Sequence, residues 1–237
     1  MGAMNKNIRS QIRRQGRSVL ETGSRYKSFD QVRQRHFWST YLFTPDANGY
    51  IASGQNFNLF STPQGQSGQG FTTQLTDLET NWKGANRVPD NQNIMITEIG
   101  VTVGTVPFGV RGGAVAANVP DGLVTENFLE NTTVSIVYLT NQVELGRCSD
   151  FAQASGPTHG AYAPSTAALS TPRFVTNGLA APGLRRRFKV PILLQHGETF
   201  SFAYIIPRSF NIGVAGTTQQ VYARLDFWAT ESFVEKS

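Results

Sequence analysis

Residues 188–206, FKVPILLQHGETFSFAYII, decide the fold class. Both halves of this segment, 188–194 and 199–206, place an aromatic or aliphatic residue at every second position. That period is typical of a β-strand with one buried face. His196 and Gly197 lie between the halves and supply a turn. The segment therefore predicts two strands joined by a short polar hairpin turn.

The same alternation recurs along the rest of the chain, separated by regions rich in Gly, Pro, Asn and Ser. Asn141 and Gln142 are expected to form the turn of a hairpin, and residues 64–70, QGQSGQG, have the composition of a flexible loop. Long connections are expected at 61–92, 107–131 and 149–185. The further expected strands cover residues 37–44, 50–52, 57–60, 94–106, 132–139, 143–148 and 220–229.

The composition agrees with a strand-rich globular chain. Of 237 residues, 39% are hydrophobic and 11% aromatic, which is too apolar for a disordered chain. Only 16% are charged, against about 25% in an ordinary soluble protein, and this is typical of a surface covered by partners. No apolar run approaches the roughly 20 residues that span a bilayer, and the basic start lacks the apolar stretch of a secretory signal.

These features predict an all-β protein, a single eight-stranded jelly-roll β-sandwich with long loops. About eight strands, with short hairpins alternating with long crossovers, fit this arrangement of Greek keys. The expected domain covers residues 36–237 and follows a basic N-terminal arm, residues 1–35. The single cysteine, Cys148, excludes an intrachain disulfide and is interpreted as a small buried residue in or near a strand.

Positive charge is concentrated in the arm. Residues 1–35 carry a net charge of +7, whereas the other 202 residues carry −2. Part of the arm is expected to form a helix with arginines along one side. Contact with phosphates of nucleic acid, without sequence specificity, is one interpretation; an anionic lipid face and a disordered, solubilising tail are the others. The residues proposed for nucleic-acid or lipid contact are Arg9, Arg13, Arg14 and Arg17.

A second basic group precedes the strand at 188–194. It consists of Arg185, Arg186 and Arg187, followed by Lys189. Alternation places Arg185, Arg187 and Lys189 on the face opposite Phe188, Val190 and Ile192. The group is interpreted either as a solvated strand entrance or as a candidate subunit interface.

Catalytic and metal-binding patterns are missing from the sequence. None of the three histidines, His36, His159 and His196, has a second His or Cys at metal-ligand spacing. His196 and Glu198 give only part of the ligand set of a cupin, and no nucleophile elbow or phosphate-binding loop occurs. The close acidic pairs, Asp77 with Glu79 and Glu126 with Glu130, are expected in loops. The expectation is a protein that is not an enzyme, with no cofactor, no metal and no small-molecule substrate.

Three segments carry a resemblance to a known family: residues 36–43, HFWSTYLF, residues 88–96, VPDNQNIMI, and residues 187–200, RFKVPILLQHGETF. With the basic arm, this layout resembles the jelly-roll coat proteins of small icosahedral viruses, most of all the major capsid proteins of tailless bacteriophages. The resemblance is one of architecture and covers about residues 36–230.

If it holds, the resemblance implies self-assembly into a closed shell. The arm would face the interior, against genome, an internal membrane or neighbouring subunits. The implied partners are other copies of the chain, other capsid or vertex proteins, and non-specifically bound nucleic acid or a membrane. The implied location is the virion, after synthesis in the host cytoplasm.

Two other classes stay open at the level of sequence. A receptor- or carbohydrate-binding β-sandwich of a spike or vertex protein would use Trp38 or Trp82 to stack on a sugar. An enzyme built on a sandwich scaffold would depend on His196 and Glu198.

Overall fold

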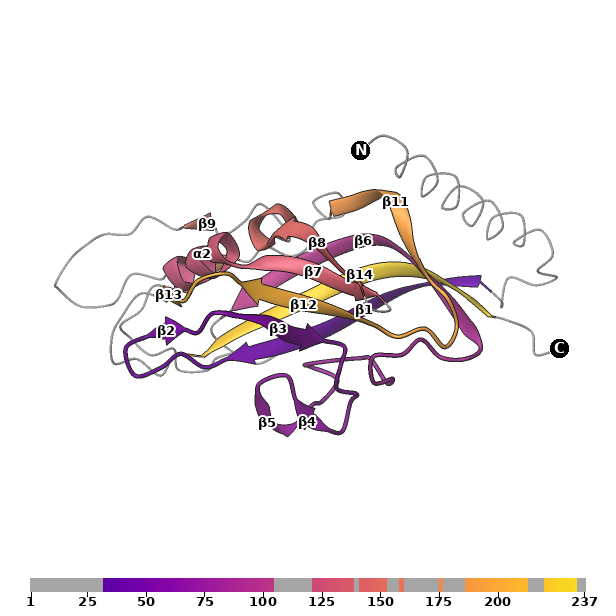
Figure 1. Ribbon diagram of the computed structural model, residues 1–237, viewed down its shortest axis with the longest axis horizontal. Coiled ribbons are helices and arrows are strands. Elements are labelled where there is room, and N and C mark those ends of the chain that lie inside the picture. Colours follow the sequence, from indigo (N-terminus) through magenta and orange to yellow (C-terminus); the bar gives the residue numbers. More distant parts are fainter. Residues whose placement is uncertain are drawn as a thin grey trace.

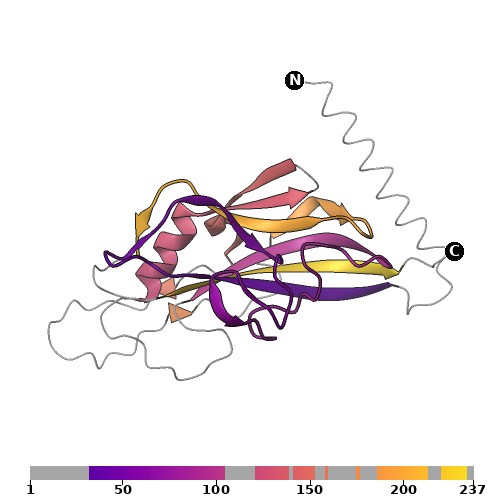
Figure 2. The ribbon, with the colours of Figure 1, turned by 60° about the horizontal axis from the view of Figure 1, so that its bottom comes forward.

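Antiparallel β-strands make up most of the structure, a computed structural model that describes residues 32–104, 121–138, 141–152, 158–159, 175–176, 186–212 and 220–233. The strands form two four-stranded sheets that pack against each other with an apolar core between them (Figures 1 and 2). The protein is therefore an all-β sandwich, as the alternating sequence predicts. No helix in the described ranges is both long enough and apolar enough to cross a membrane.

The first sheet has the order β1-β14-β6-β11, and every neighbouring pair is antiparallel. Its longest strands are rich in aromatic and β-branched residues, which favour extended backbone. The strands are β1 (Val32–Phe43), β14 (Val221–Phe233), β6 (Gln92–Gly104) and β11 (Arg186–Leu194).

The second sheet has the order β3-β12-β7-β8 and is also antiparallel throughout. Its centre is the second half of the segment that decides the fold class, where Phe200, Phe202, Tyr204 and Ile206 are all buried as predicted. The strands are β3 (Gly54–Leu59), β12 (Phe200–Ile206), β7 (Thr133–Tyr138) and β8 (Asn141–Arg147).

Pairing along the chain is nested. The first long strand pairs with the last, β1 with β14, and the next ones inward follow the same rule: β3 pairs with β12, β6 with β11, and β7 with β8. Two further contacts, β14 with β6 and β12 with β7, join these pairs into the two sheets.

More strands occur than the eight expected from the sequence. Besides the eight long strands, short strands form three two-stranded ribbons. Only β2 falls within an expected strand, residues 50–52; the other short strands span too few residues to show a period. The ribbons are β2 (Tyr50–Ile51) with β13 (Phe210–Asn211), β4 (Ser67–Gly68) with β5 (Phe71–Gln74), and β9 (Thr158–His159) with β10 (Val175–Thr176).

The core is built around aromatic rings from both sheets. Phe227 of β14 is fully buried, and five rings surround it with centroids 5.0 to 6.5 Å away. Such tilted and edge-to-face pairs add to the stability that burial itself supplies. The surrounding rings belong to Phe37, Phe60, Trp82, Phe200 and Phe202.

A helix lies where the sequence predicted only a long connection. Helix α2 (Asp121–Asn131) occupies the end of the expected loop 107–131, so Glu126 and Glu130 lie on a helix. Val124, Phe128 and Leu129 are buried by it against the core. The helix is hard to predict because it is short and contains the weak helix formers Gly, Asn and Thr.

Three other sequence expectations need correction. The hairpin of β7 and β8 exists, but Asn141 lies in β8 opposite Tyr138, so Asn141 and Gln142 are not the turn. His196 and Gly197 do form a turn, with Gly197 at φ +74°, yet it links strands of different sheets. The first strand begins at Val32, so residues 32–35 belong to the sheet and not to the arm.

Replacing Tyr204 by phenylalanine should raise the free energy of unfolding by about 1 kcal/mol. The Tyr204 hydroxyl is fully buried and has no hydrogen-bond partner among the described residues, and this burial raises its pKa well above the usual value. Urea unfolding measures the change. Tyr138→Phe is the control: the Tyr138 hydroxyl donates to Glu198 Oε1 at 2.8 Å, so its removal should lower stability instead. A loss of stability in both variants would contradict this interpretation.

Candidate interaction surfaces

The arginines proposed from the sequence are only partly within the described residues. Arg9, Arg13, Arg14, Arg17 and Arg185 lie outside them. Arg186 and Arg187 begin β11, where Arg187 Nε donates to Glu98 Oε1 at 2.6 Å and the Arg186 guanidinium lies 5.4 Å from the Phe151 ring centroid. The Arg187 side chain is 82% exposed, so this ion pair contributes little to stability and leaves the charge at the surface.

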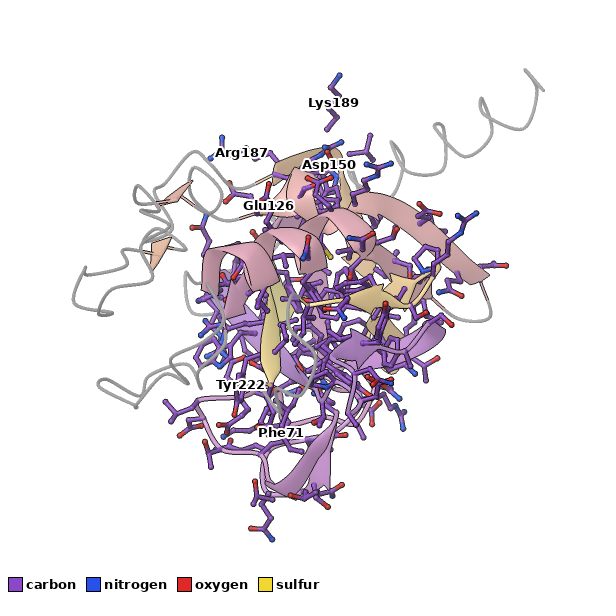
Figure 3. The ribbon with its side chains drawn as sticks, turned by 90° about the vertical axis from the view of Figure 1, so that its left-hand side faces the viewer. Phe71, Glu126, Asp150, Arg187, Lys189 and Tyr222 are labelled. Atoms are coloured by element: carbon purple, nitrogen blue, oxygen red, sulfur yellow. The ribbon has the colours of Figure 1, made fainter. Side chains whose placement is uncertain are left out.

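Strand β11 departs from simple alternation immediately after Arg187. Arg187 is opposite Glu98 and Ile192 is opposite Ile96, so residues 188–191 bulge out opposite a single residue of β6. The predicted inward position of Val190 is wrong: its side chain is 48% exposed. Pro191 lacks a backbone N–H and suits such a break in the ladder. Figure 3 shows Lys189 pointing away from the body of the protein.

The last two arginines of the expected arm hold the end of the first sheet. Arg33 Nε donates to Glu231 Oε2 at 2.6 Å, and Arg35 Nη1 lies 3.5 Å from Glu231 Oε1. Glu231 is 1% exposed, so the two guanidinium groups compensate a buried carboxylate. Arg33 and Arg35 thus have a structural role in the sandwich.

A group of charged and aromatic side chains lies on the outer face of the first sheet; its members, which we name the outer-face cluster, are His36, Trp38, Arg224, Asp226 and Trp228. Asp226 is buried at its centre, with His36 Nε2 and Arg224 Nη2 each 2.7 Å from its Oδ1. The His36 ring stacks on Trp228 with centroids 4.5 Å apart. The Arg224 guanidinium lies 4.9 Å from the Trp38 ring centroid.

The outer-face cluster has the composition of a contact surface. Trp and Arg are among the residues that contribute most to protein–protein interfaces. His36, Trp38, Arg224 and Trp228 are all partly exposed, while the one carboxylate between them is compensated. The group was not predicted from the sequence, although alternation along β14 places Arg224, Asp226 and Trp228 on one face and would have been the signal.

Neither tryptophan proposed for sugar stacking offers an open ring. Trp82 is 3% exposed and packs in the aromatic core. One face of Trp38 is covered by Arg224, and its indole Nε1 donates to the Asp77 carbonyl oxygen at 3.1 Å. The site expected for a carbohydrate-binding sandwich therefore receives no support from these two residues.

His196 and Glu198 stabilise the turn between β11 and β12 through hydrogen bonds. Glu198 accepts hydrogen bonds from the Tyr138 hydroxyl and from the Gln195 backbone N–H. Burial, followed by the bond to Glu198, raises the pKa of Tyr138 to about 12. The His196 backbone N–H donates to Asn93 Oδ1 at 2.9 Å. Within the described ranges, no three His, Cys, Asp or Glu side chains gather in a way that could hold a metal ion.

The outer edge of β1, which pairs with no other strand of its sheet, is covered by residues of the expected long connection 61–92. Asn81 Nδ2 donates to the His36 carbonyl oxygen and Asn81 Oδ1 accepts from the Trp38 N–H, both at 2.9 Å. Further along, the Leu42 N–H donates to the Gln69 carbonyl oxygen at 2.9 Å. Residues 64–70 are therefore not a simple flexible loop, because Gln69 is buried and fixed to β1. Covering an edge in this way prevents pairing with another strand.

Strand β8 forms one edge of the second sheet. β8 pairs with β7 on one side, and no described strand lies on its other side. Residues 141–144 are all exposed, and Val143, at 52%, is the most exposed of the large hydrophobic side chains described. An exposed strand edge with an apolar residue is a site for strand pairing.

Comparison with other proteins adds no further constraint: no family model, curated protein or solved structure matches the chain.

Proposed function

We propose that this chain is a structural capsid protein that self-assembles into a closed icosahedral shell of a virus or phage. The observation that carries the proposal is the nested pairing of the eight long strands. Numbered one to eight in chain order, they pair one with eight, two with seven, three with six and four with five, in sheets ordered 1-8-3-6 and 2-7-4-5. We take this order as support for a jelly roll, in which a folded-back ribbon of four strand pairs wraps into two Greek keys.

Jelly rolls serve as capsid proteins, lectins and cupin enzymes, so the fold alone leaves three classes and supports the first only by analogy. The described side chains favour the first class. A cupin would need a histidine cluster, but His36 is bound to Asp226 and His196 lies in a turn beside Asn93. The two tryptophans considered for sugar stacking are unsuited to a lectin site, because Trp82 is in the core and Trp38 is covered by Arg224.

Charge distribution supports the proposal independently of the fold. With the boundary at Val32, where β1 begins, residues 1–31 carry a net charge of +5 and the net charge of residues 32–237 is zero. A neutral body can pack against copies of itself without repulsion, while a basic arm attracts polyanions. We therefore propose that the arm faces the shell interior, against genome, an internal membrane or neighbouring subunits.

The proposal includes the partners and the location that a shell protein has. Other copies of the chain are the main partners, followed by other capsid or vertex proteins and by non-specifically bound nucleic acid or lipid. The location is the virion, after synthesis in the host cytoplasm. The outer-face cluster and the β8 edge are the surfaces available for contacts between copies.

Removal of residues 1–31 tests both parts of the proposal. The full-length chain should sediment as large assemblies that carry nucleic acid or lipid. The variant without the arm should still assemble but carry much less of either, because seven of the 21 basic residues are gone. Analytical ultracentrifugation, absorbance at 260 and 280 nm, and lipid analysis give the readouts. Monomers of both proteins across a range of salt and protein concentrations would contradict the proposal.

A further inference from the structure

The four sheet edges of the sandwich are not equally available for pairing. The edge of β1 is covered through Asn81 and Gln69. β3 lies beside β1, where Phe57 packs on Tyr41 and Phe43 with ring centroids 5.4 and 4.9 Å apart. β11 is interrupted by the bulge at 188–191. Of the four edge strands of the two large sheets, β8 has the most accessible regular edge: residues 141–144 are all exposed, whereas the described side chains of β3 are buried or only partly exposed.

We infer that β8 of one copy pairs with β8 of a second copy, antiparallel about a two-fold axis, with Val143 opposite Val143. This inference rests on the proposed function and deepens it by naming one contact between subunits. Backbone N–H and C=O groups along a strand edge are satisfied by another extended strand, and two identical edges are complementary when they run antiparallel.

The side chains of β8 select this register. With Val143 on the axis, Gln142 lies opposite Glu144 of the partner strand. The Gln142 amide donates one N–H to Ser135 Oγ at 3.0 Å, and its second N–H can donate to the partner carboxylate. A shift that places Glu144 on the axis brings two carboxylates opposite each other, which is destabilising. A shift to Gln142 on the axis places Val143 opposite Asn141, and the apolar side chain then loses its apolar partner.

The proposed pairing also extends the core. Val143 is opposite Ile136 of β7, and Ile136 is 4% exposed and belongs to the apolar core. Val143 therefore lies on the core-facing side of the sheet, but at its rim, where it is 52% exposed. A second Val143 across the axis would cover this rim and join two four-stranded sheets into one continuous sheet of eight strands.

Cysteine cross-linking of the full-length chain tests the inference. Directly opposite residues of antiparallel strands have Cβ atoms about 4.5–5.5 Å apart, close to the roughly 3.5–4.5 Å of a disulfide. Mild oxidation should therefore join Val143→Cys chains into a covalent dimer, read on a non-reducing gel. The matched control is Val190→Cys, since Val190 is 48% exposed on the other sheet. The native thiol does not interfere, because Cys148 is buried and burial raises its pKa well above the usual value.

Val143→Cys should give a dimer yield on the order of tenfold above that of Val190→Cys, because pairing holds the two thiols at a high effective concentration. A second variant, Val143→Lys, places two positive charges opposite each other and should abolish the dimer in solution while the chain itself still folds, as its circular dichroism spectrum would show. Sedimentation of the variant against the native chain measures that loss.

Equal dimer yields for Val143→Cys and Val190→Cys would overturn the β8 contact, as would a Val143→Lys protein that dimerises like the native chain. These results are distinct from a failure of the proposed function. If shells form but Val143→Cys gives no specific disulfide, the β8 contact is refuted and the capsid proposal is not. If Val143→Cys gives the specific dimer but no larger assemblies form, the β8 contact is supported and the capsid proposal is refuted.

Discussion

Gly70→Ala should destabilise the protein by at least about 3 kcal/mol, a large fraction of the roughly 5–15 kcal/mol that stabilises an ordinary domain. Gly70 has φ +84°, and a Cβ atom there would lie 1.9 Å from the carbonyl oxygen of Leu42. That oxygen belongs to the backbone of β1 and cannot move away, because Leu42 is paired with Tyr222 of β14 and its N–H is bound to Gln69. The whole segment must shift, and the cover over the β1 edge is lost with it.

Gly65→Ala is the matched control for this substitution. Gly65 has nearly the same backbone angle, φ +86°, but a Cβ atom added there would have no other atom within 4 Å. The change should therefore cost only the left-handed strain of a non-glycine residue, about 1–2 kcal/mol. Urea unfolding followed by tryptophan fluorescence measures both variants. Equal destabilisation of the two would show that Gly70 is not held against β1.

Asp226→Asn should lower the free energy of unfolding by about 3 kcal/mol. Asp226 is 2% exposed and its Oδ1 accepts from Arg224 Nε at 3.0 Å and from Arg224 Nη2 at 2.7 Å, with His36 Nε2 also at 2.7 Å. The substitution removes the buried negative charge that holds the partly buried Arg224 guanidinium against Trp38. The loss should also disorder the outer-face cluster, which near-ultraviolet circular dichroism of Trp38 and Trp228 would detect.

The control for Asp226→Asn is the same change at a surface ion pair. Asp90 Oδ1 accepts from Arg87 Nη2 at 2.7 Å, but the two side chains are 70% and 59% exposed. Asp90→Asn should change stability by less than about 1 kcal/mol, because solvent screens exposed pairs. If Asp226→Asn is as mild as Asp90→Asn, the outer-face cluster does not depend on its buried carboxylate.

Much of the fold could be predicted from the sequence because strands with one buried face reveal themselves by period. β14 is an example, with Leu225 and Phe227 buried where alternation places them. In β12, Phe200 and Phe202 are buried as alternation predicts, but Ser201 and Ala203 on the other face are buried too. The period fails where the ladder is interrupted. Val190 is exposed because four residues of β11 bulge opposite one residue of β6. Within residues 188–194, only Pro191 indicates such a bulge.

The surfaces were harder to predict than the core. The outer-face cluster joins residues of β1 and β14, and its members His36 and Asp226 are 190 residues apart in the sequence. The cover over the β1 edge is equally non-local, since Asn81 and Gln69 belong to a region whose composition is that of a loop. Both depend on strand register, which a single sequence does not specify without knowledge of which strands pair.

Assembly is the central claim, and negative-stain electron microscopy of the purified full-length chain tests it most directly. We expect closed, roughly spherical shells of uniform diameter, or regular capsomers, at high protein concentration. A field of separate particles of monomer size, under every salt condition that keeps the chain folded, would contradict the capsid proposal.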